Sequence, residues 1–291
     1  MLQSSGRLVL CPTPLGNLED ITLRTLRELR GCDVIFAEDT RVARKLLSHF
    51  AIAKPVESFH ERVETQRIRR LRALLAAGQT VAVVSDAGMP GISDPGAELV
   101  RAARSAGAVV DALPGPNAAL GALALSGFDV ARFRFDGFPP RQRGERRAYL
   151  RSLDAELHPV ALYEAPSRVV GLLEDAAALL PERRLFVLRE YTKLFEQQIL
   201  GTAVFALAQL ARPPRGEFCV VVEGARRQDR SKEIPAAVYD AIAALLEAGT
   251  SVRATADALS LATGLPKNAL YKLAQSLKEQ APSRPRGTSH A

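Results

Sequence analysis

Residues that build metal centres and disulfide frameworks are scarce in this sequence. Its 291 residues include four scattered histidines and three cysteines, Cys11, Cys32 and Cys219. The cysteines are odd in number, and no two of them have the spacing of metal ligands. We therefore expect neither a metal site nor a set of disulfides. The thiols should lie in the hydrophobic core, where a free cysteine behaves as a small apolar group.

Long apolar runs are also absent. No stretch reaches the roughly 18 residues that a membrane span requires, and the N-terminal segment has too few apolar residues for a signal peptide. We therefore expect a cytoplasmic protein without a membrane partner. The hydrophobic content of 47% and the charged content of 24% are those of an ordinary globular protein.

The usual phosphate-binding motifs are missing as well. Neither G-x-G-x-x-G nor G-x-x-x-x-G-K-[ST] occurs in the sequence, so a dinucleotide or triphosphate site is not indicated. The G-x-S-x-G elbow is also absent, which argues against a serine hydrolase.

Short aliphatic runs alternate with helical patterns over the first part of the chain. In each run the odd and the even positions are both apolar, which is typical of strands buried on both faces of a parallel sheet. This alternation predicts an α/β fold. A polar stretch then separates a second α/β segment from a purely helical one. The predicted domains are residues 1–127, 128–225 and 235–280, with a linker at 226–234 and a disordered tail at 281–291.

Four unusual loops follow the predicted strands of the first domain, where α/β sheets bind ligands. They are "PTPLGN" at 12–17, "AEDTR" at 37–41, "SDAGMPGISDPG" at 85–96 and "PGPN" at 114–117. Any one of them could be an ordinary turn, because glycine and proline are common in loops. Four in one half of the chain favour a shared ligand site.

The composition of these loops indicates the charge of the ligand. Their prolines lack an N–H donor, and Glu38, Asp39, Asp86 and Asp94 add negative charge. Such a site disfavours phosphate and suits a cation. S-adenosylmethionine, which carries a sulfonium and an ammonium, fits this description.

Positive charge is concentrated elsewhere. The net charge is +7 and the isoelectric point is about 9.6, which admits a polyanionic partner. Seven arginines crowd into residues 132–151, and the prolines and glycine among them predict an exposed, mobile loop. Such a loop could contact an RNA backbone, although a solvated surface is the alternative. The candidate RNA-binding residues are Arg141, Arg143, Arg146 and Arg147.

Eight motifs in order resemble a known family. They are "PTPLGNLEDIT", "AEDTR", "SDAGMPGISDPG", "LPGPNAAL", "ALSGF", "YEAPSR", "REYTK" and "GEFCVVVEG". Their order over residues 7–224 is similar to that of the tetrapyrrole methylase superfamily, and within it to a bacterial branch of ribosomal RNA methyltransferases. The resemblance implies two α/β domains with S-adenosylmethionine in a cleft between them, and a homodimer. It also implies 2′-O-methylation of a cytidine in the decoding region of 16S rRNA, in the small ribosomal subunit.

The same resemblance assigns the site. Asp86 would shape its loop or face the cationic groups of the cofactor. Glu38 and Asp39 are candidates to accept the proton of the 2′-hydroxyl, and the alternative is a helix N-cap with Arg41 as its counter-ion. Ser167 stands where relatives usually carry histidine. The implied cofactor contacts are Leu15, Ala87, Gly88, Ile92, Asn117, Ala118 and, from the second domain, Glu164.

The C-terminal segment resembles a helix-turn-helix near residues 235–279. Lys267 and Lys272 would then lie on the exposed side of its second helix, suited to RNA phosphates. A small bundle for packing or dimerisation is the alternative. For the whole chain, the alternatives are a methylase of a small tetrapyrrole or protein side chain, and a non-enzymatic nucleic-acid-binding regulator with a ligand-sensing α/β part.

Overall fold

The computed structural model describes residues 6–59, 64–93, 96–225 and 234–280. Asp94, the predicted tail and all of the predicted linker except residue 234 lie outside this part. The chain divides into two compact units, Met1–Ala225 and Arg226–Ala291, which are described separately below.

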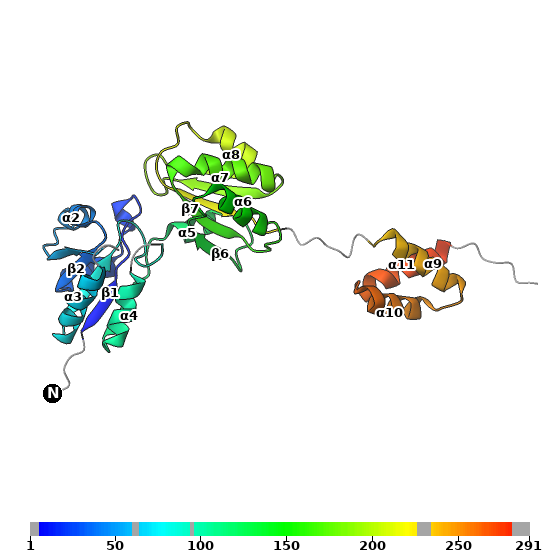
Figure 1. Ribbon diagram of the computed structural model, residues 1–291, viewed down its shortest axis with the longest axis horizontal. Helices are drawn as coiled ribbons and strands as arrows, with labels where there is room; N and C mark the ends of the chain where they lie inside the picture. Colours follow the sequence, from blue (N-terminus) through cyan, green and yellow to red (C-terminus); the bar gives the residue numbers. More distant parts are fainter. Residues whose placement is uncertain (1–5, 60–63, 94–95, 226–233, 281–291) are drawn as a thin grey trace, which may run out of the picture. The chain divides into compact units, whose positions relative to one another are not determined.

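The first unit opens with a five-stranded parallel sheet (Figure 1). Its order is β3-β2-β4-β1-β5, and each neighbouring pair is parallel. All four residues of β2 are buried, as expected for an aliphatic run covered on both faces. The predicted α/β architecture with a parallel sheet is confirmed. The strands are β1 (Arg7–Leu10), β2 (Val34–Ala37), β3 (Val56–Ser58), β4 (Thr80–Val84) and β5 (Val109–Ala112).

Helices cover both faces of this sheet. Leu71 and Leu99 pack with the side chains of one face, and Leu29 and Leu47 pack with those of the other. Polar side chains set where several of these helices begin, since Thr22, Asp39 and Asn117 each accept a hydrogen bond from a first-turn amide. The elements are η1 (Leu18–Asp20), α1 (Leu23–Gly31), α2 (Thr40–His49), α3 (Glu64–Ala76), α4 (Ala97–Ser105) and α5 (Ala118–Ser126).

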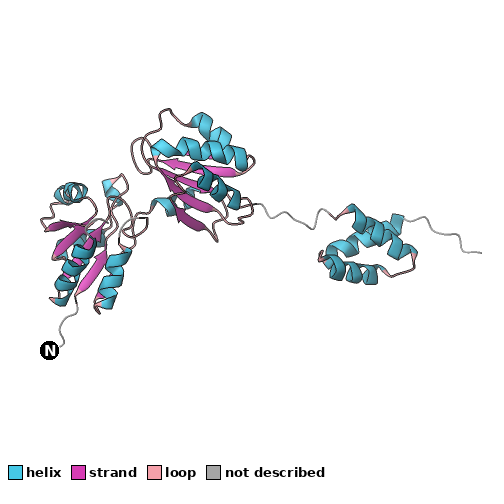
Figure 2. Ribbon diagram, in the orientation of Figure 1, coloured by secondary structure: helices cyan, strands magenta, loops and turns pink. Residues whose placement is uncertain are grey.

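A second five-stranded sheet follows in the same unit (Figure 2). Its order is β6-β7-β10-β8-β9, and only the β6/β7 pair is parallel. Side chains of its three helices form one core with the sheet. The elements are β6 (Arg134–Gly137), α6 (Arg143–Ser152), β7 (Val160–Glu164), α7 (Pro166–Leu179), β8 (Arg184–Arg189), β9 (Gln197–Thr202), α8 (Ala203–Gln209) and β10 (Phe218–Val222).

Helix α5 belongs to the core of the second sheet. Ala122 and Leu123 pack with Phe186 and Val221, and the Ala119 amide donates a hydrogen bond to the Tyr163 hydroxyl at 3.3 Å. The residues of this helix fall within the predicted first domain, 1–127. In the structure, the segment after "PGPN" therefore connects the two sheets.

The second unit is helical, as predicted. Helix α10 ends at Thr263 and is capped by Gly264, which adopts a left-handed conformation with φ of 70° and so allows the sharp turn into the next helix. Ile242, Ala256, Leu270 and Ala274 form its buried core. None of the described helices is long and apolar enough to cross a membrane. The helices are α9 (Ala236–Glu247), α10 (Val252–Thr263) and α11 (Lys267–Gln280).

Candidate functional site

A cavity of about 400 Å³ lies at the predicted loops of the first unit. This volume is in the usual range for small-molecule sites. Nine of the ten predicted catalytic and cofactor residues line it, and Asp39 is the exception. The nine are Leu15, Glu38, Asp86, Ala87, Gly88, Ile92, Asn117, Ala118 and Glu164.

Hydrogen bonds join three of the four loops into one wall. Thr13 and Gly88 exchange backbone hydrogen bonds of 2.9 and 3.0 Å. Gly88 has φ of +81°, and a Cβ there would lie 3.1 Å from a Leu15 methyl group, so glycine allows this close approach. The Asp39 amide donates to Asp86 Oδ1 at 3.0 Å. Asp86 therefore ties its own loop to the loop at 37–41, and it also lines the cavity.

Glu38 and Asp39 are neighbours with different surroundings. Glu38 lines the cavity, and burial together with the nearby charge of Asp86 raises the pKa of its carboxyl group. Asp39 caps helix α2 by accepting from the Arg41 amide at 2.7 Å, and its carboxylate pairs with the Arg41 guanidinium at 2.6 Å. These contacts hold the pKa of Asp39 well below its usual range. The structure thus gives Asp39 the capping role and leaves Glu38 as the candidate base.

Glu164 supplies a buried acceptor at the end of β7. Its side chain is 0% exposed, and Oε1 accepts from the Ala165 amide and pairs with the Arg168 guanidinium at 3.1 Å. The other oxygen, Oε2, has no hydrogen-bond partner among the described residues. Burial raises the pKa of this carboxyl group. Because an unpaired buried acceptor is costly, Oε2 is suited to a donor on a bound ligand.

The charge of the cavity wall agrees with the sequence-based expectation of a cationic ligand. The lining contains four carboxylates, those of Glu38, Asp86, Glu164 and Glu217. It contains no lysine, arginine or histidine among the described residues. Such a wall attracts ammonium, sulfonium or amino groups and repels phosphate.

Several lining residues were not among the predicted site residues. Phe138, Tyr163 and Leu188 come from the second sheet and its loops, and Tyr191 lies in the "REYTK" motif. The Tyr191 ring packs where a Cβ on Gly121 of α5 would lie, at 2.5 Å. The quoted motifs "YEAPSR" and "REYTK" contain Tyr163 and Tyr191, whereas no quoted motif contains Phe138 or Leu188, whose place in the cavity depends on how the second sheet folds.

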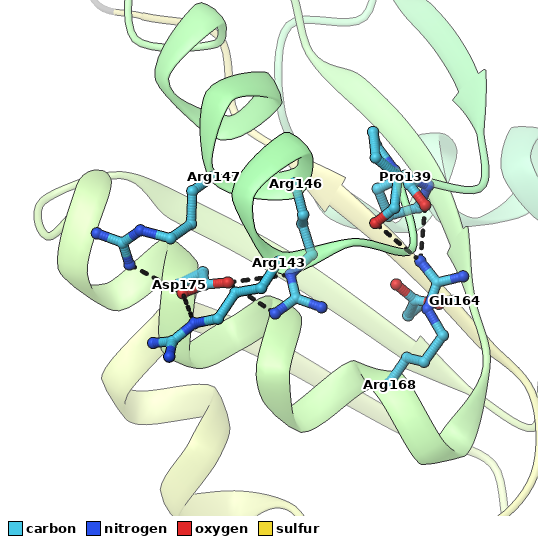
Figure 3. Close-up of polar contacts among 8 residues, drawn as sticks. Pro139, Arg143, Arg146, Arg147, Glu164, Arg168 and Asp175 are labelled. Atoms are coloured by element: carbon cyan, nitrogen blue, oxygen red, sulfur yellow. Dashed lines mark hydrogen bonds and ion pairs between the residues drawn. The ribbon is translucent and has the colours of Figure 1, made fainter.

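The predicted mobile arginine loop is wrong from residue 143 onward, where helix α6 begins. Arg146 is buried, and its guanidinium binds Asp175 of α7 at 2.7 Å (Figure 3). Arg147 and Arg143 reach the other Asp175 oxygen at 2.9 and 3.4 Å. The buried carboxylate therefore orders this segment. Arg141, which precedes the helix, is exposed.

The two predicted lysine contacts lie on helix α11 of the second unit. Both Lys267 and Lys272 are exposed. Lys267 forms an ion pair with Asp257 of α10, which neutralises part of its charge. Lys272 is the freer of the two to meet a phosphate.

Comparison with known proteins identifies the family. Residues 7–208 match the family described as Tetrapyrrole (Corrin/Porphyrin) Methylases. The chain belongs to the tetrapyrrole methylase family. It is accordingly an enzyme, a methyltransferase, and S-adenosylmethionine is its methyl donor.

Several similar relatives of this tetrapyrrole methylase are named "Ribosomal RNA small subunit methyltransferase I". The Synechocystis protein is 42% identical over 275 residues, covering 94% of this chain and 99% of the relative. The Escherichia coli O157:H7 protein is 41% identical over 276 residues, covering 93% and 95%. The Thermotoga maritima protein is 44% identical over 220 residues, which are 75% of this chain and 99% of the relative.

Solved structures of low identity share the fold. The uroporphyrin-III-C-methyltransferase of Thermus thermophilus has a TM-score of 0.53 at 23% identity, covering 74% of this chain and 94% of that one. A diphthine synthase has a TM-score of 0.58 at 14% identity, covering 75% and 90%. These similarities support the tetrapyrrole methylase architecture.

The residues of this methylase fit its cofactor. The acidic lining matches the two cationic groups of S-adenosylmethionine, and the unpaired Glu164 Oε2 matches a donor such as an amino group. Both observations concern the chemistry of the wall and are independent of the family assignment. The proline-rich, acidic loops of the sequence and the acidic lining of the cavity both suit this cationic cofactor.

Proposed function

We propose that this methyltransferase methylates the ribose 2′-hydroxyl of a cytidine in the decoding region of 16S rRNA. The observation that carries the proposal is Glu38, a carboxylate of raised pKa inside an acidic cavity free of basic side chains in the described residues. The relatives near 40% identity support ribosomal RNA as the substrate class.

In this proposal the cofactor-binding residues contact different parts of the cofactor. The four lining carboxylates favour the cationic groups, and Glu164 Oε2 accepts from a donor of the cofactor. Leu15, Ile92 and the backbone of Gly88 provide its close-fitting wall. When bound, S-adenosylmethionine supplies an activated methyl group on a good leaving group, so alignment contributes much of the rate.

Glu38 performs the proton transfer. A ribose hydroxyl is a weak nucleophile, and a carboxylate within reach can accept its proton as the new C–O bond forms. The raised pKa of Glu38 makes it a stronger base than an exposed glutamate. Asp39 is less suited, because Arg41 and the helix cap stabilise its charged form.

RNA would approach through cations outside the cavity. Arg141 and Arg143 are exposed, and Lys272 is exposed on α11. The acidic lining keeps phosphates out of the cavity, so the backbone of the RNA has to be held by basic residues that do not line it, such as Arg141. The substrate in this proposal is the small ribosomal subunit or its 16S rRNA, and the enzyme works in the cytoplasm.

The proposal includes a homodimer. Leu194 and Phe195 are strongly exposed, as are Val204 and Phe205 of the neighbouring α8, and β9 is an edge strand. Exposed apolar groups next to an open edge favour association. Sedimentation equilibrium should give twice the mass of the chain, and a monomer at micromolar concentration would contradict the dimer.

The proposal is tested by methyl transfer in vitro. The purified chain and labelled S-adenosylmethionine are incubated with small ribosomal subunits from a strain lacking the gene, and in parallel with naked 16S rRNA. Digestion to nucleosides should place the label in 2′-O-methylcytidine. Label in a base, in a protein side chain, or in neither RNA would overturn the proposal. Labelling of an added tetrapyrrole instead would support the alternative substrate class.

A further inference from the structure

Phe138 has an unusual position beside the cavity. Its side chain lines the cavity and is nevertheless 54% exposed. Its ring lies 5.9 Å from that of Tyr163 in an edge-to-face arrangement, and Tyr163 packs in the same way on Phe135 at 4.9 Å. One face of an aromatic cluster is thus open to solvent at the edge of the site.

The backbone next to Phe138 is held in place. Arg168 donates to the Pro139 carbonyl oxygen at 2.6 Å and also reaches that of Pro140 (Figure 3). The same guanidinium pairs with the buried Glu164 at the cavity wall. A cation anchored in the site therefore fixes the two residues that follow Phe138, and this limits the movement of its ring.

A second anchor on the same helix strengthens this arrangement. Arg168, Gly171 and Asp175 have i, i+3 and i+7 spacing, which places them on one face of α7. Asp175 binds Arg146, and the guanidinium of Arg146 lies 3.2 Å from where a Cβ on Gly171 would be. The segment from 139 to 147 is thus fastened to α7 at two points.

The chemistry around Phe138 matches one kind of ligand. Proteins recognise single-stranded RNA by stacking bases on exposed aromatic rings, with cations beside them for the phosphates. Arg141 is exposed three residues after Phe138. The acidic cavity wall excludes phosphate but admits a ribose, so a base next to that ribose would lie at the rim where Phe138 is open.

We propose that Phe138 is the platform on which the base of the target nucleotide stacks, and that Arg168 is the positioning residue that holds this platform. The inference rests on the proposed function, since it supposes an RNA substrate. Beyond that function, the inference assigns nucleotide selection to Phe138. The ring can accept only a base that is free to stack, so a nucleotide paired within an RNA helix is excluded.

The test compares Phe138→Ala with Phe133→Ala. Phe133 is a matched control, because it lies in the same arginine-rich segment and is 44% exposed but does not line the cavity. Binding to small ribosomal subunits is measured with saturating S-adenosylhomocysteine, and turnover is measured alongside. Phe138→Ala should weaken binding about tenfold, as loss of one stacked base does. Phe138→Tyr should restore it, and Phe133→Ala should bind as the wild type does.

The outcomes separate this inference from the proposed function. Equal binding by the wild type and Phe138→Ala would overturn the platform even if methylation occurs. An equal loss in Phe133→Ala would show only general attraction to RNA, and it would overturn the platform too. A fall in affinity for S-adenosylhomocysteine in Phe138→Ala, measured by calorimetry, would place the ring over the cofactor instead. Weaker subunit binding by Phe138→Ala without turnover in the wild type would support the platform and sink the proposed reaction.

The positioning role of Arg168 is tested by measuring subunit binding in a single and a double variant. Arg168→Gln should weaken subunit binding in the same direction as Phe138→Ala. If Arg168 acts through the ring, the double variant should bind no worse than Phe138→Ala alone. Additive losses would overturn the positioning role, as would unchanged binding by Arg168→Gln.

Discussion

Two adjacent carboxylates show how strongly the surroundings of a residue determine its role. Glu38 lines the cavity, and its carboxyl group lies near the negative charge of Asp86. Asp39 points to the first turn of α2 and to Arg41. The first environment favours the protonated form and the second favours the charged form. Of the two, only Glu38 has the raised pKa and the location that a general base needs.

Glu38→Gln should therefore lower kcat on the order of a hundredfold, the contribution typical of a general base. In the wild type, kcat should rise with pH through a pKa above the ordinary glutamate value of 4.5, and the variant should lose this dependence. Asp39→Asn is the matched control, because asparagine caps a helix as well as aspartate does. Equal losses in both variants, by initial rates across pH, would reject the assignment.

A substitution at Glu164 should change the affinity for the cofactor without lowering the stability of the fold. The raised pKa of Glu164 means that the folded state holds the proton more tightly than the unfolded state, so ionisation destabilises the fold as pH rises above 4.5. Glu164→Gln removes this cost and can still accept from Ala165 and Arg168. We expect an equal or higher Tm at pH 7 and an affinity for S-adenosylmethionine about tenfold lower. Wild-type affinity should fall as pH drops through the raised pKa.

Calorimetry on Glu164→Gln and the wild type from pH 5 to pH 8 checks this expectation. A variant that binds the cofactor as the wild type does at pH 8 would show that Oε2 faces no ligand donor. A lower Tm at pH 7 would show that the charged carboxylate stabilises the fold.

The strand pattern predicted where the cavity-lining loops of the first sheet lie, because parallel strands bring their carboxyl ends to one edge of the sheet. The individual cofactor contacts in these loops came from the family resemblance. Phe138 lies in none of the quoted motifs, and Tyr163 stands in "YEAPSR" but was not predicted as a site residue, because the places of both depend on the folding of the second sheet. The sequence also left the burial of Arg146 unseen. Its partner Asp175 lies 29 residues away, and no local pattern connects a surface-type residue to a distant buried acceptor.

At the level of elements, α7 organises the arginine-rich segment. In the sequence, Pro139, Pro140 and Gly144 predict a mobile loop, but the chain enters helix α6 at Arg143. Asp175 provides a charged acceptor for three arginines, and it is 1% exposed. Burial alone would raise the pKa of Asp175, but the hydrogen bonds from Arg146 and Arg147 outweigh it and the pKa lies below its ordinary value.

Asp175→Asn should destabilise the first unit by about 3 kcal/mol, since removal of one partner leaves buried charge unpaired. Because the folded pKa is lowered, the contribution is complete above the ordinary value of 3.8 and is lost as pH falls through the folded pKa. The deficit should therefore be full at pH 7 and shrink in acid. Urea unfolding at several pH values measures it.

Arg143→Ala is the control for that experiment. Its side chain is 75% exposed, and an exposed ion pair contributes about 1 kcal/mol or less. A loss in Arg143→Ala as large as in Asp175→Asn would contradict the central place of the buried carboxylate. So would a deficit that persists unchanged in acid.

On the scale of the whole molecule, charge is divided between regions. The protein is basic overall, with a net charge of +7, yet the described lining of its cavity is acidic. This division suits an enzyme that holds a cationic cofactor inside and a polyanion outside. The second unit has its own hydrophobic core, and the four core clusters of the first unit have no member beyond residue 222.

A chain that ends at Ala225 should therefore fold and bind the cofactor. The Thermotoga maritima relative is consistent with this, because the 220 matched residues are 99% of its length and close to the length of the first unit. We expect an unchanged affinity for S-adenosylhomocysteine by calorimetry, and a higher KM for small ribosomal subunits with a similar kcat. Lys272→Glu in the full chain should raise KM in the same direction, since Lys272 is exposed on α11. An unchanged KM in both proteins would show that the C-terminal helices serve only packing or dimerisation. Loss of cofactor affinity in the truncated chain would show that the first unit depends on the second.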